Sequence, residues 1–158
     1  ISGYLLLDMW KRMLRLLSSL SIWEHTFGAL VQLPDLPLKD LPKGWILDLD
    51  GTLVVHNGYK TGEDTILPGV KDFFEKNVKP DDYVLIISAR FSEFKGIAEK
   101  CLDENGIRYD KIIYDTPRGE RILINDRKPW GGGLDTAYSI NIDRNEGLWR
   151  SVFTTKDI

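Results

Sequence analysis

Two aspartates at the end of one apolar run are the first residues of this sequence that could do chemistry. The run 45–50, Trp-Ile-Leu-Asp-Leu-Asp, ends with Asp48 and Asp50, and Gly51 and Thr52 follow it. Residues two apart on a strand share a face, so both carboxylates can point at one spot. Such a pair suits Mg²⁺, which proteins hold through one or two carboxylates together with substrate phosphate. Aspartate also serves as a covalent nucleophile toward phosphorus.

Two further segments place polar groups after apolar runs. Ser88-Ala89-Arg90 follows the run 83–87 and offers a hydroxyl, main-chain N–H groups and a guanidinium to a phosphate. The run 121–125 leads into Asp126, a third carboxylate, with Lys128 two residues later. If these runs are parallel strands, all three segments meet where ligands bind in open sheets, at the carboxyl ends.

The alternation of apolar runs and helical spacing predicts the elements that position these groups. Strands are predicted at 45–50, 83–87, 111–114, 121–125 and 137–142, and helices at 67–76 and 94–105. Apolar strands interleaved with helices predict an α/β fold, a Rossmann-like three-layer α/β/α sandwich with a mostly parallel central sheet. Gly51 is expected to make a tight turn after the first strand, with N–H groups beyond it free to face an anion.

Composition bounds the class of protein. The 158 residues suit one globular domain, alone or with a short appendage. The net charge of −3 excludes a strongly basic surface that binds nucleic acid as a whole, and leaves room for a local basic patch. Cys101 is the one cysteine, which excludes a disulfide framework and a Cys-x-x-Cys site. No apolar run of about 18 residues or more occurs, which excludes a spanning helix. The sequence therefore predicts a soluble protein of a reducing compartment, the cytoplasm.

Residues 1–43 differ from the remainder. Leu6, Trp10, Leu14 and Leu17 follow helical apolar spacing, and the proline-rich stretch 33–42 is typical of an extended linker. We therefore predict a docking arm at 1–43, which binds its own domain or a protein partner, and a catalytic core at 44–158. A membrane-surface helix and a disordered segment stay open as alternatives for the arm.

The core resembles a known superfamily. The segment 48–53, Asp-Leu-Asp-Gly-Thr-Leu, resembles the first motif of the haloacid dehalogenase superfamily; Ser88 is similar to its second motif and Asn125-Asp126 to its fourth. The resemblance covers roughly residues 45–145 and implies a small capless (C0-type) phosphatase, because the spacing between motifs leaves no room for an inserted cap. A capless site is open, with 56–64 as a short flap.

The resemblance also implies a role for each motif residue. Asp48 would be the nucleophile that forms an aspartyl-phosphate, and Asp50 the general acid and then the base. Mg²⁺ would be held by the carboxylates of Asp48 and Asp126 and the main-chain carbonyl of Asp50. The phosphoryl oxygens would be bound by donors of the same loops: Gly51, Thr52, Ser88, Ala89, Arg90 and Lys128.

One motif departs from the superfamily pattern. The third motif is a lysine that offsets the charge of aspartate and phosphate, and Asp115-Thr116-Pro117 stands in its place. Lys128 or Lys111 could take this role; otherwise the metal and Arg90 would have to balance the charge.

These observations predict a Mg²⁺-dependent phosphomonoester hydrolase acting on a sugar phosphate or another small, open-access phosphomonoester. The alternative is a catalytically weak or inactive binding or structural subunit of a larger assembly. A nucleic-acid end phosphatase is a third possibility, against which the acidic balance and the lack of a basic run argue.

Overall fold

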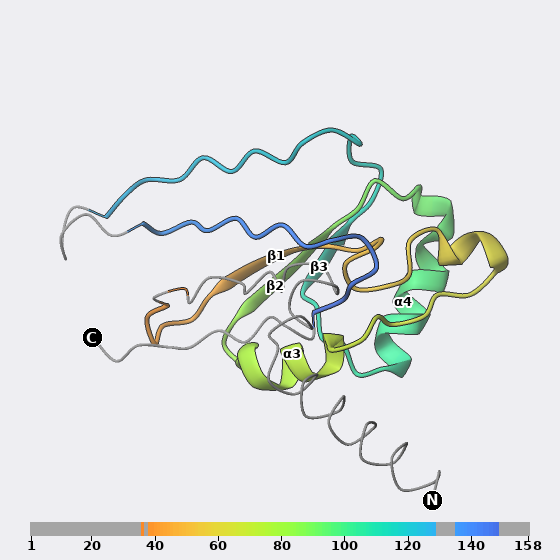
Figure 1. Ribbon diagram of the computed structural model, residues 1–158, viewed down its shortest axis with the longest axis horizontal. Coiled ribbons are helices and arrows are strands. Elements are labelled where there is room, and N and C mark those ends of the chain that lie inside the picture. Colours follow the sequence, from red (N-terminus) through yellow and green to blue (C-terminus); the bar gives the residue numbers. More distant parts are fainter. Residues whose placement is uncertain (1–35, 37, 129–134, 149–158) are drawn as a thin grey trace, which may run out of the picture. The chain divides into compact units, whose positions relative to one another are not determined.

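The computed structural model describes residue 36, residues 38–128 and residues 135–148 (Figure 1). The chain divides into two units, Ile1–Gln32 and Leu33–Ile158, and all described residues belong to the second. The helix predicted near the N-terminus lies outside the described residues, so the docking arm and the boundary at 43/44 stay predictions. Among the described residues, no helix has the length and apolarity needed to cross a membrane.

Three parallel strands form an open sheet in the order β1-β2-β3. The elements in chain order are β1 (Gly44–Asp48), the 3₁₀ helix η1 (Gly58–Thr61), α3 (Val70–Asn77), β2 (Tyr83–Ile87), the 3₁₀ helix η2 (Ser92–Phe94), α4 (Lys95–Glu104) and β3 (Lys111–Ile113). Asp48 pairs in register with Ile87, and Ile87 with Ile113, so the carboxyl ends of the strands are aligned at one edge. The predicted α/β fold with a parallel sheet is confirmed.

One face of the sheet carries the core. Val84 and Ile86 on β2 are 0% exposed, and the helices α3 and α4 contribute Phe73 and Leu102 to the same cluster. Burying a side chain as large as Phe73 stabilises the fold by about 1.5–3 kcal/mol. The other face is more open, with Ile46 49% exposed. The helices of a third layer, predicted for that face, are not among the described residues.

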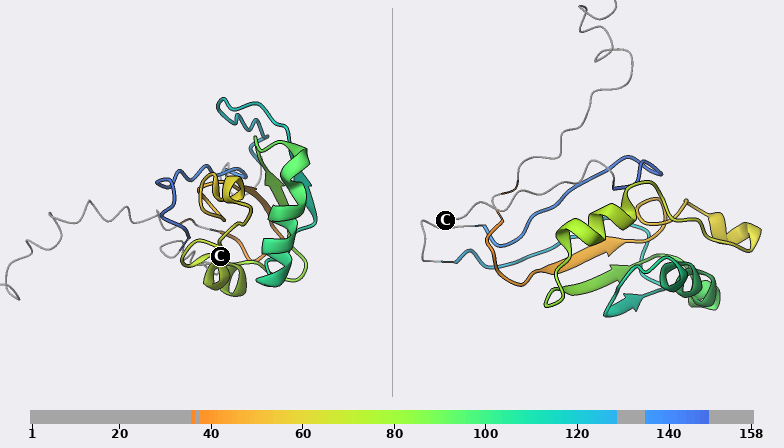
Figure 2. Two further views of the ribbon diagram at one scale, coloured as in Figure 1. Left: turned by 90° about the vertical axis from the view of Figure 1, so that its right-hand side faces the viewer. Right: turned by 90° about the horizontal axis from the view of Figure 1, so that it is seen from below.

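The strands predicted at 121–125 and 137–142 are wrong. The structure has no strand in either range, and Ile122 and Ile124 are 84% and 90% exposed. The two segments (Figures 1 and 2) meet through side chains, since Asn125 Nδ2 donates to Thr136 Oγ1 at 2.8 Å. An apolar run predicts burial, but a strand also needs a partner backbone, and no described strand pairs with the outer edge of β1.

The segment 143–148 packs against the loop that follows β1. The amide of Asn145 donates to the Gly51 carbonyl at 2.9 Å, and the amide of Leu148 to that of Pro68 at 3.0 Å. Gly147 has a φ of 74°, and an added Cβ there would lie 2.2 Å from the Pro68 oxygen. Only glycine fits this approach. The end of the described chain therefore helps to fix the loop that carries the first motif.

Asp82, buried just before β2, joins the beginnings of two strands. Its carboxylate accepts from the amide of Lys43 at 2.8 Å, from the indole N–H of Trp45 at 2.7 Å and from the amide of Lys79 at 2.9 Å. Burial by itself disfavours the charge, but these hydrogen bonds favour it more, and the pKa of Asp82 is lowered. The ionised carboxylate thus stabilises the fold.

Replacing Asp82 with alanine should lower the free energy of unfolding by about 2–3 kcal/mol at pH 7, because buried donors lose a charged acceptor. A carboxyl group whose pKa is lowered in the folded state stabilises above its unfolded pKa of about 3.9. This contribution is lost as pH falls through the folded pKa. The difference between wild type and Asp82→Ala in urea unfolding should therefore shrink below about pH 4. Asp81→Ala, at an exposed neighbour, is the control; a difference as large at pH 2.5 as at pH 7 would contradict the assignment.

Candidate active site

The carboxyl edge of the sheet brings together the segments that follow β1, β2 and β3. Asp48 ends β1, and Ser88 to Arg90 follow β2 directly. The amide of Asp115 donates to the carbonyl of Arg90 at 3.0 Å, and that of Thr116 to Ser88 at 3.1 Å. These bonds extend the pairing of β2 with β3 beyond the strands, so the loop 88–90 is held in place.

Asp48 is the accessible carboxylate at this edge. Its side chain is 33% exposed, and Oδ1 lies 2.8 Å from Nη2 of Arg121. Oδ2 accepts from Thr52 Oγ1 at 3.3 Å. Burial raises the pKa of Asp48, an effect that the Arg121 guanidinium and the hydrogen bonds partly offset. Asp48 therefore combines access to solvent with one neighbouring cation.

Asp50 is held on both of its oxygens. Arg90 donates from Nε to Oδ2 at 3.1 Å and from Nη2 to Oδ1 at 2.7 Å. Ser88 Oγ donates to Oδ2 at 3.2 Å and accepts from the amide of Arg90 at 3.0 Å. The Asp50 side chain is 15% exposed, so it still reaches the surface beside Asp48. The structure thus joins Asp50, Ser88 and Arg90, which were all predicted to belong to the site, in one network.

Arg90 makes a second ion pair, with Asp64, on its other side. Nη1 and Nη2 donate to the two oxygens of Asp64, and the side chains of both residues are 0% exposed. The ring of Tyr59 stacks 4.3 Å from the Arg90 guanidinium carbon. Burial disfavours the charge, but the two carboxylates outweigh it and raise the pKa of Arg90. The guanidinium predicted to bind phosphate is therefore fully buried against two carboxylates.

The N–H groups predicted to face an anion after β1 are used within the turn. The amide of Gly51 donates to the Val54 carbonyl at 2.7 Å, and that of Thr52 to Leu49 at 3.4 Å. Gly51 has a φ of 88°, in agreement with the predicted tight turn. Ala89 is half-buried between Ser88 and Arg90. Phosphate binding by Gly51, Thr52 and Ala89 stays a prediction.

Asp126 and the two candidate lysines are not brought to Asp48. Lys128 Nζ lies 3.4 Å from the Asp126 carboxylate, and both side chains are exposed. Lys111 is the first residue of β3, at the edge opposite the carboxyl ends. The reason is the unpaired segment 121–125: without a partner strand, nothing carries Asp126 to the end of β1.

Arg121 is the functional candidate that the sequence reasoning missed. Besides its ion pair with Asp48, Nη2 donates to the Ile87 carbonyl at 3.2 Å, so it spans the ends of β1 and β2. It therefore lies where a cation that offsets the charge of Asp48 is needed. The sequence itself gives a reason to consider Arg121. It lies shortly after Asp115-Thr116-Pro117, the segment that stands where the superfamily has its third-motif lysine.

The donor set predicted for Mg²⁺ is present only in part. The described residues contain no group of three or more histidine, cysteine, aspartate or glutamate side chains that could hold a metal ion. Asp126, one of the two predicted carboxylate ligands, is exposed and pairs with Lys128. Asp48 fits as one protein ligand, because Mg²⁺ takes its remaining ligands from water and substrate phosphate.

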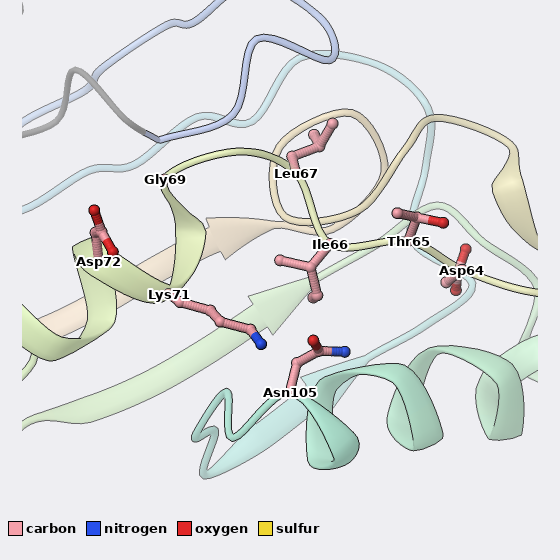
Figure 3. Close-up of a pocket in the computed structure, with 8 residues that line it drawn as sticks. All are labelled: Asp64, Thr65, Ile66, Leu67, Gly69, Lys71, Asp72 and Asn105. Carbon is pink, nitrogen blue, oxygen red and sulfur yellow. The ribbon is translucent and has the colours of Figure 1, made fainter.

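A hollow of about 490 Å³ is lined by residues of the segment 64–69, the first turn of α3 and Asn105 after α4 (Figure 3). Its lining is mixed: Asp64, Thr65, Ile66, Leu67, Gly69, Lys71, Asp72 and Asn105. Asp48, Asp50 and Arg90 do not line it, and Asp64 is the one residue of the Arg90 network that does. Between β1 and β2 the described chain holds only η1 and α3.

Comparisons with known proteins leave the family open. No known protein family matches the sequence, and no curated protein does. A structure of the Pnkp1/Rnl/Hen1 complex is 26% identical, with a TM-score of 0.42, over 52% of this chain and 31% of the matched one. A structure of the Pnkp1/Rnl/Hen1 RNA repair complex is 25% identical, with a TM-score of 0.42, over 59% and 33%. The chain thus matches about a third of these chains, and the TM-score is too low to transfer an activity.

Replacing Arg90 with alanine should cost about 3–5 kcal/mol of unfolding free energy, because two carboxylates would be left buried without their cation. Urea unfolding followed by circular dichroism measures the loss. Lys100→Ala removes an exposed i,i+4 pair with Glu104 and should cost no more than about 0.5 kcal/mol. Similar small losses for both variants would show that Arg90 is not a buried bridge.

Proposed function

We propose that the chain is a phosphomonoester hydrolase in which Asp48 attacks phosphorus. The observation that carries the proposal is the pair at the end of β1, where an accessible Asp48 faces the Arg121 guanidinium and Asp50 is oriented beside it by Arg90 and Ser88. The substrate is a sugar phosphate or another open-access phosphomonoester, since the described chain places only η1 and α3 between β1 and β2 and leaves Asp48 reachable.

In the first step a carboxylate oxygen of Asp48 forms a bond to phosphorus as the ester P–O bond breaks. The leaving alkoxide takes a proton that Asp50 has first taken up from solvent on Oδ1, where the contact with Arg90 Nη2 leaves a second lone pair. In the second step water attacks phosphorus, the bond to Asp48 breaks and Asp50 takes the proton of the water, which releases inorganic phosphate. The Arg121 guanidinium offsets negative charge beside Asp48 throughout. Mg²⁺, held in part by Asp48, would supply further charge stabilisation at the phosphoryl oxygens.

A second candidate is a binding or structural subunit on the same scaffold. The incomplete metal donor set supports it, because the described residues bring no third carboxylate to Asp48 and Asp50. Such a subunit would retain the buried network around Arg90 and lack turnover.

Asp48→Asn should reduce phosphate release to below about a thousandth of wild type, because the amide cannot attack phosphorus. The assay is release of inorganic phosphate from p-nitrophenyl phosphate, a sugar phosphate and a 3′-phosphorylated oligonucleotide, with Mg²⁺ or with EDTA. Asp72→Asn, at an exposed aspartate paired with Lys76, is the matched control and should behave as wild type.

Turnover retained in Asp48→Asn would refute the mechanism. No release from any substrate by wild type, with or without Mg²⁺, would favour the binding subunit. Release from the oligonucleotide alone, weakening as salt rises, would identify a nucleic-acid end phosphatase instead of a small-molecule enzyme.

Arg121→Gln should lower kcat/KM by about tenfold, the loss expected when one partly exposed charged contact of about 1.4 kcal/mol is removed. Arg127→Gln is the matched control, because Arg127 forms an exposed ion pair with Asp135. Equal activity of Arg121→Gln and Arg127→Gln would show that another group supplies the cation beside Asp48.

A further inference from the structure

We propose that Asp64 is a positioning residue for the general acid: it holds Arg90 in the one orientation in which both oxygens of Asp50 are fixed. Tyr59 supports the same orientation. This inference rests on the proposed function and assigns a role to a buried carboxylate that no motif of the sequence marked.

The geometry of the guanidinium carries the argument. Four hydrogen bonds leave Arg90, two to Asp50 and two to Asp64. An arginine fork is planar and rigid, so a carboxylate that binds one edge determines where the other edge points. Because Arg90 and Asp64 are both 0% exposed, water does not replace either partner.

Asp64 is itself fixed by the surrounding chain. Its main-chain carbonyl accepts from Sγ of Cys101 on α4 at 3.3 Å. The following carbonyl, of Thr65, accepts from the amide of Val55 at 2.9 Å, and Val54 forms an antiparallel bridge with Ile66. Asp64 is therefore anchored to α4 and to the loop after β1. Figure 3 shows it on the segment that leads toward α3.

Tyr59 packs against the guanidinium within the predicted flap 56–64. Its ring lies 4.3 Å from the Arg90 guanidinium carbon, and its centroid 4.8 Å from that of Phe94. A cation over an aromatic face is stabilised by about 0.5–2 kcal/mol. Tyr59 and Asp64, both in the flap, thus contact Arg90. Through Arg90 the flap holds the Asp50 carboxyl group in position.

A positioning role for Asp64 predicts a dependence of the rate on the leaving group, which a general loss of stability would not produce. A proton donor matters most when the leaving alkoxide is a strong base, and little when the leaving group is p-nitrophenolate, which departs without a proton. A displaced Asp50 should therefore slow alkyl phosphates far more than aryl phosphates, since a misplacement of about 1 Å can cost about 100-fold.

The test compares kcat/KM for glycerol phosphate and for p-nitrophenyl phosphate in the full chain. This ratio reports the steps up to departure of the leaving group and not the hydrolysis of the aspartyl-phosphate, in which Asp50 serves both substrates as base. In Asp64→Asn we expect a loss of about 100-fold for glycerol phosphate and of less than about threefold for p-nitrophenyl phosphate. Asp72→Asn is the matched exposed control and should leave both rates unchanged. Losses of equal size for both substrates, or none for either, would overturn the proposal.

Tyr59→Leu provides a second test that does not remove a buried charge, and it decides the matter if Asp64→Asn does not fold. It should lower the ratio of alkyl to aryl rates in the same direction, and Tyr59→Phe, which retains the ring over Arg90, should restore that ratio. Tyr138→Leu, at an exposed tyrosine, is the control. An unchanged ratio in Tyr59→Leu would overturn the inference. If Asp48→Asn loses turnover of p-nitrophenyl phosphate while Asp64→Asn and Tyr59→Leu keep it, the proposed function stands even where the ratio overturns this inference.

Discussion

A buried guanidinium between two carboxylates is the interaction on which the site depends. Arg90 joins Asp50, at the end of β1, to Asp64, on the segment before α3, and its side chain is 0% exposed. An unpaired charge in such a place is costly, so the three side chains are stable only together. The loops after β1 and β2 and the flap 56–64 must therefore adopt positions in which Asp50 and Asp64 both reach the Arg90 guanidinium.

The ion pairs of Arg90 determine which cation is left to neutralise Asp48 at the carboxyl edge of the sheet. Because Arg90 is occupied on both edges by Asp50 and Asp64, it does not offset the charge of Asp48, and Arg121 lies beside Asp48 instead. The pKa of Asp48 is raised chiefly by burial, which its one cation offsets only in part. An approaching phosphate would thus meet an accessible carboxylate, a partly exposed guanidinium and an oriented second carboxylate, the features that support the proposed hydrolase.

Prediction of the elements succeeded where local pattern and tertiary pairing agree. The run 83–87 became β2 with the predicted bounds, and α4 ends before Gly106, which has the positive φ typical of a helix C-terminus. The run 121–125 has an apolar centre, Ile122-Leu123-Ile124, but forms no strand, because pairing with another backbone is not encoded in its own residues. The position of Asp126 was predicted on that pairing, so a role of Asp126 as a metal ligand stays a prediction that the described structure does not support by proximity to Asp48.

The sequence alone determined the parallel α/β core and the meeting of Asp48, Asp50 and Ser88 at its carboxyl edge, since strand periodicity and the order of elements are local properties. Only the tertiary structure decided what each group contacts. Asp64 and Tyr59 reach Arg90 from the segment 56–64, which was predicted as a short flap over the site without any contact to Arg90. Arg121 reaches Asp48 across 73 positions of sequence. Ion-pair partners are chosen by distance in the folded chain, because Coulomb energy depends on separation in space.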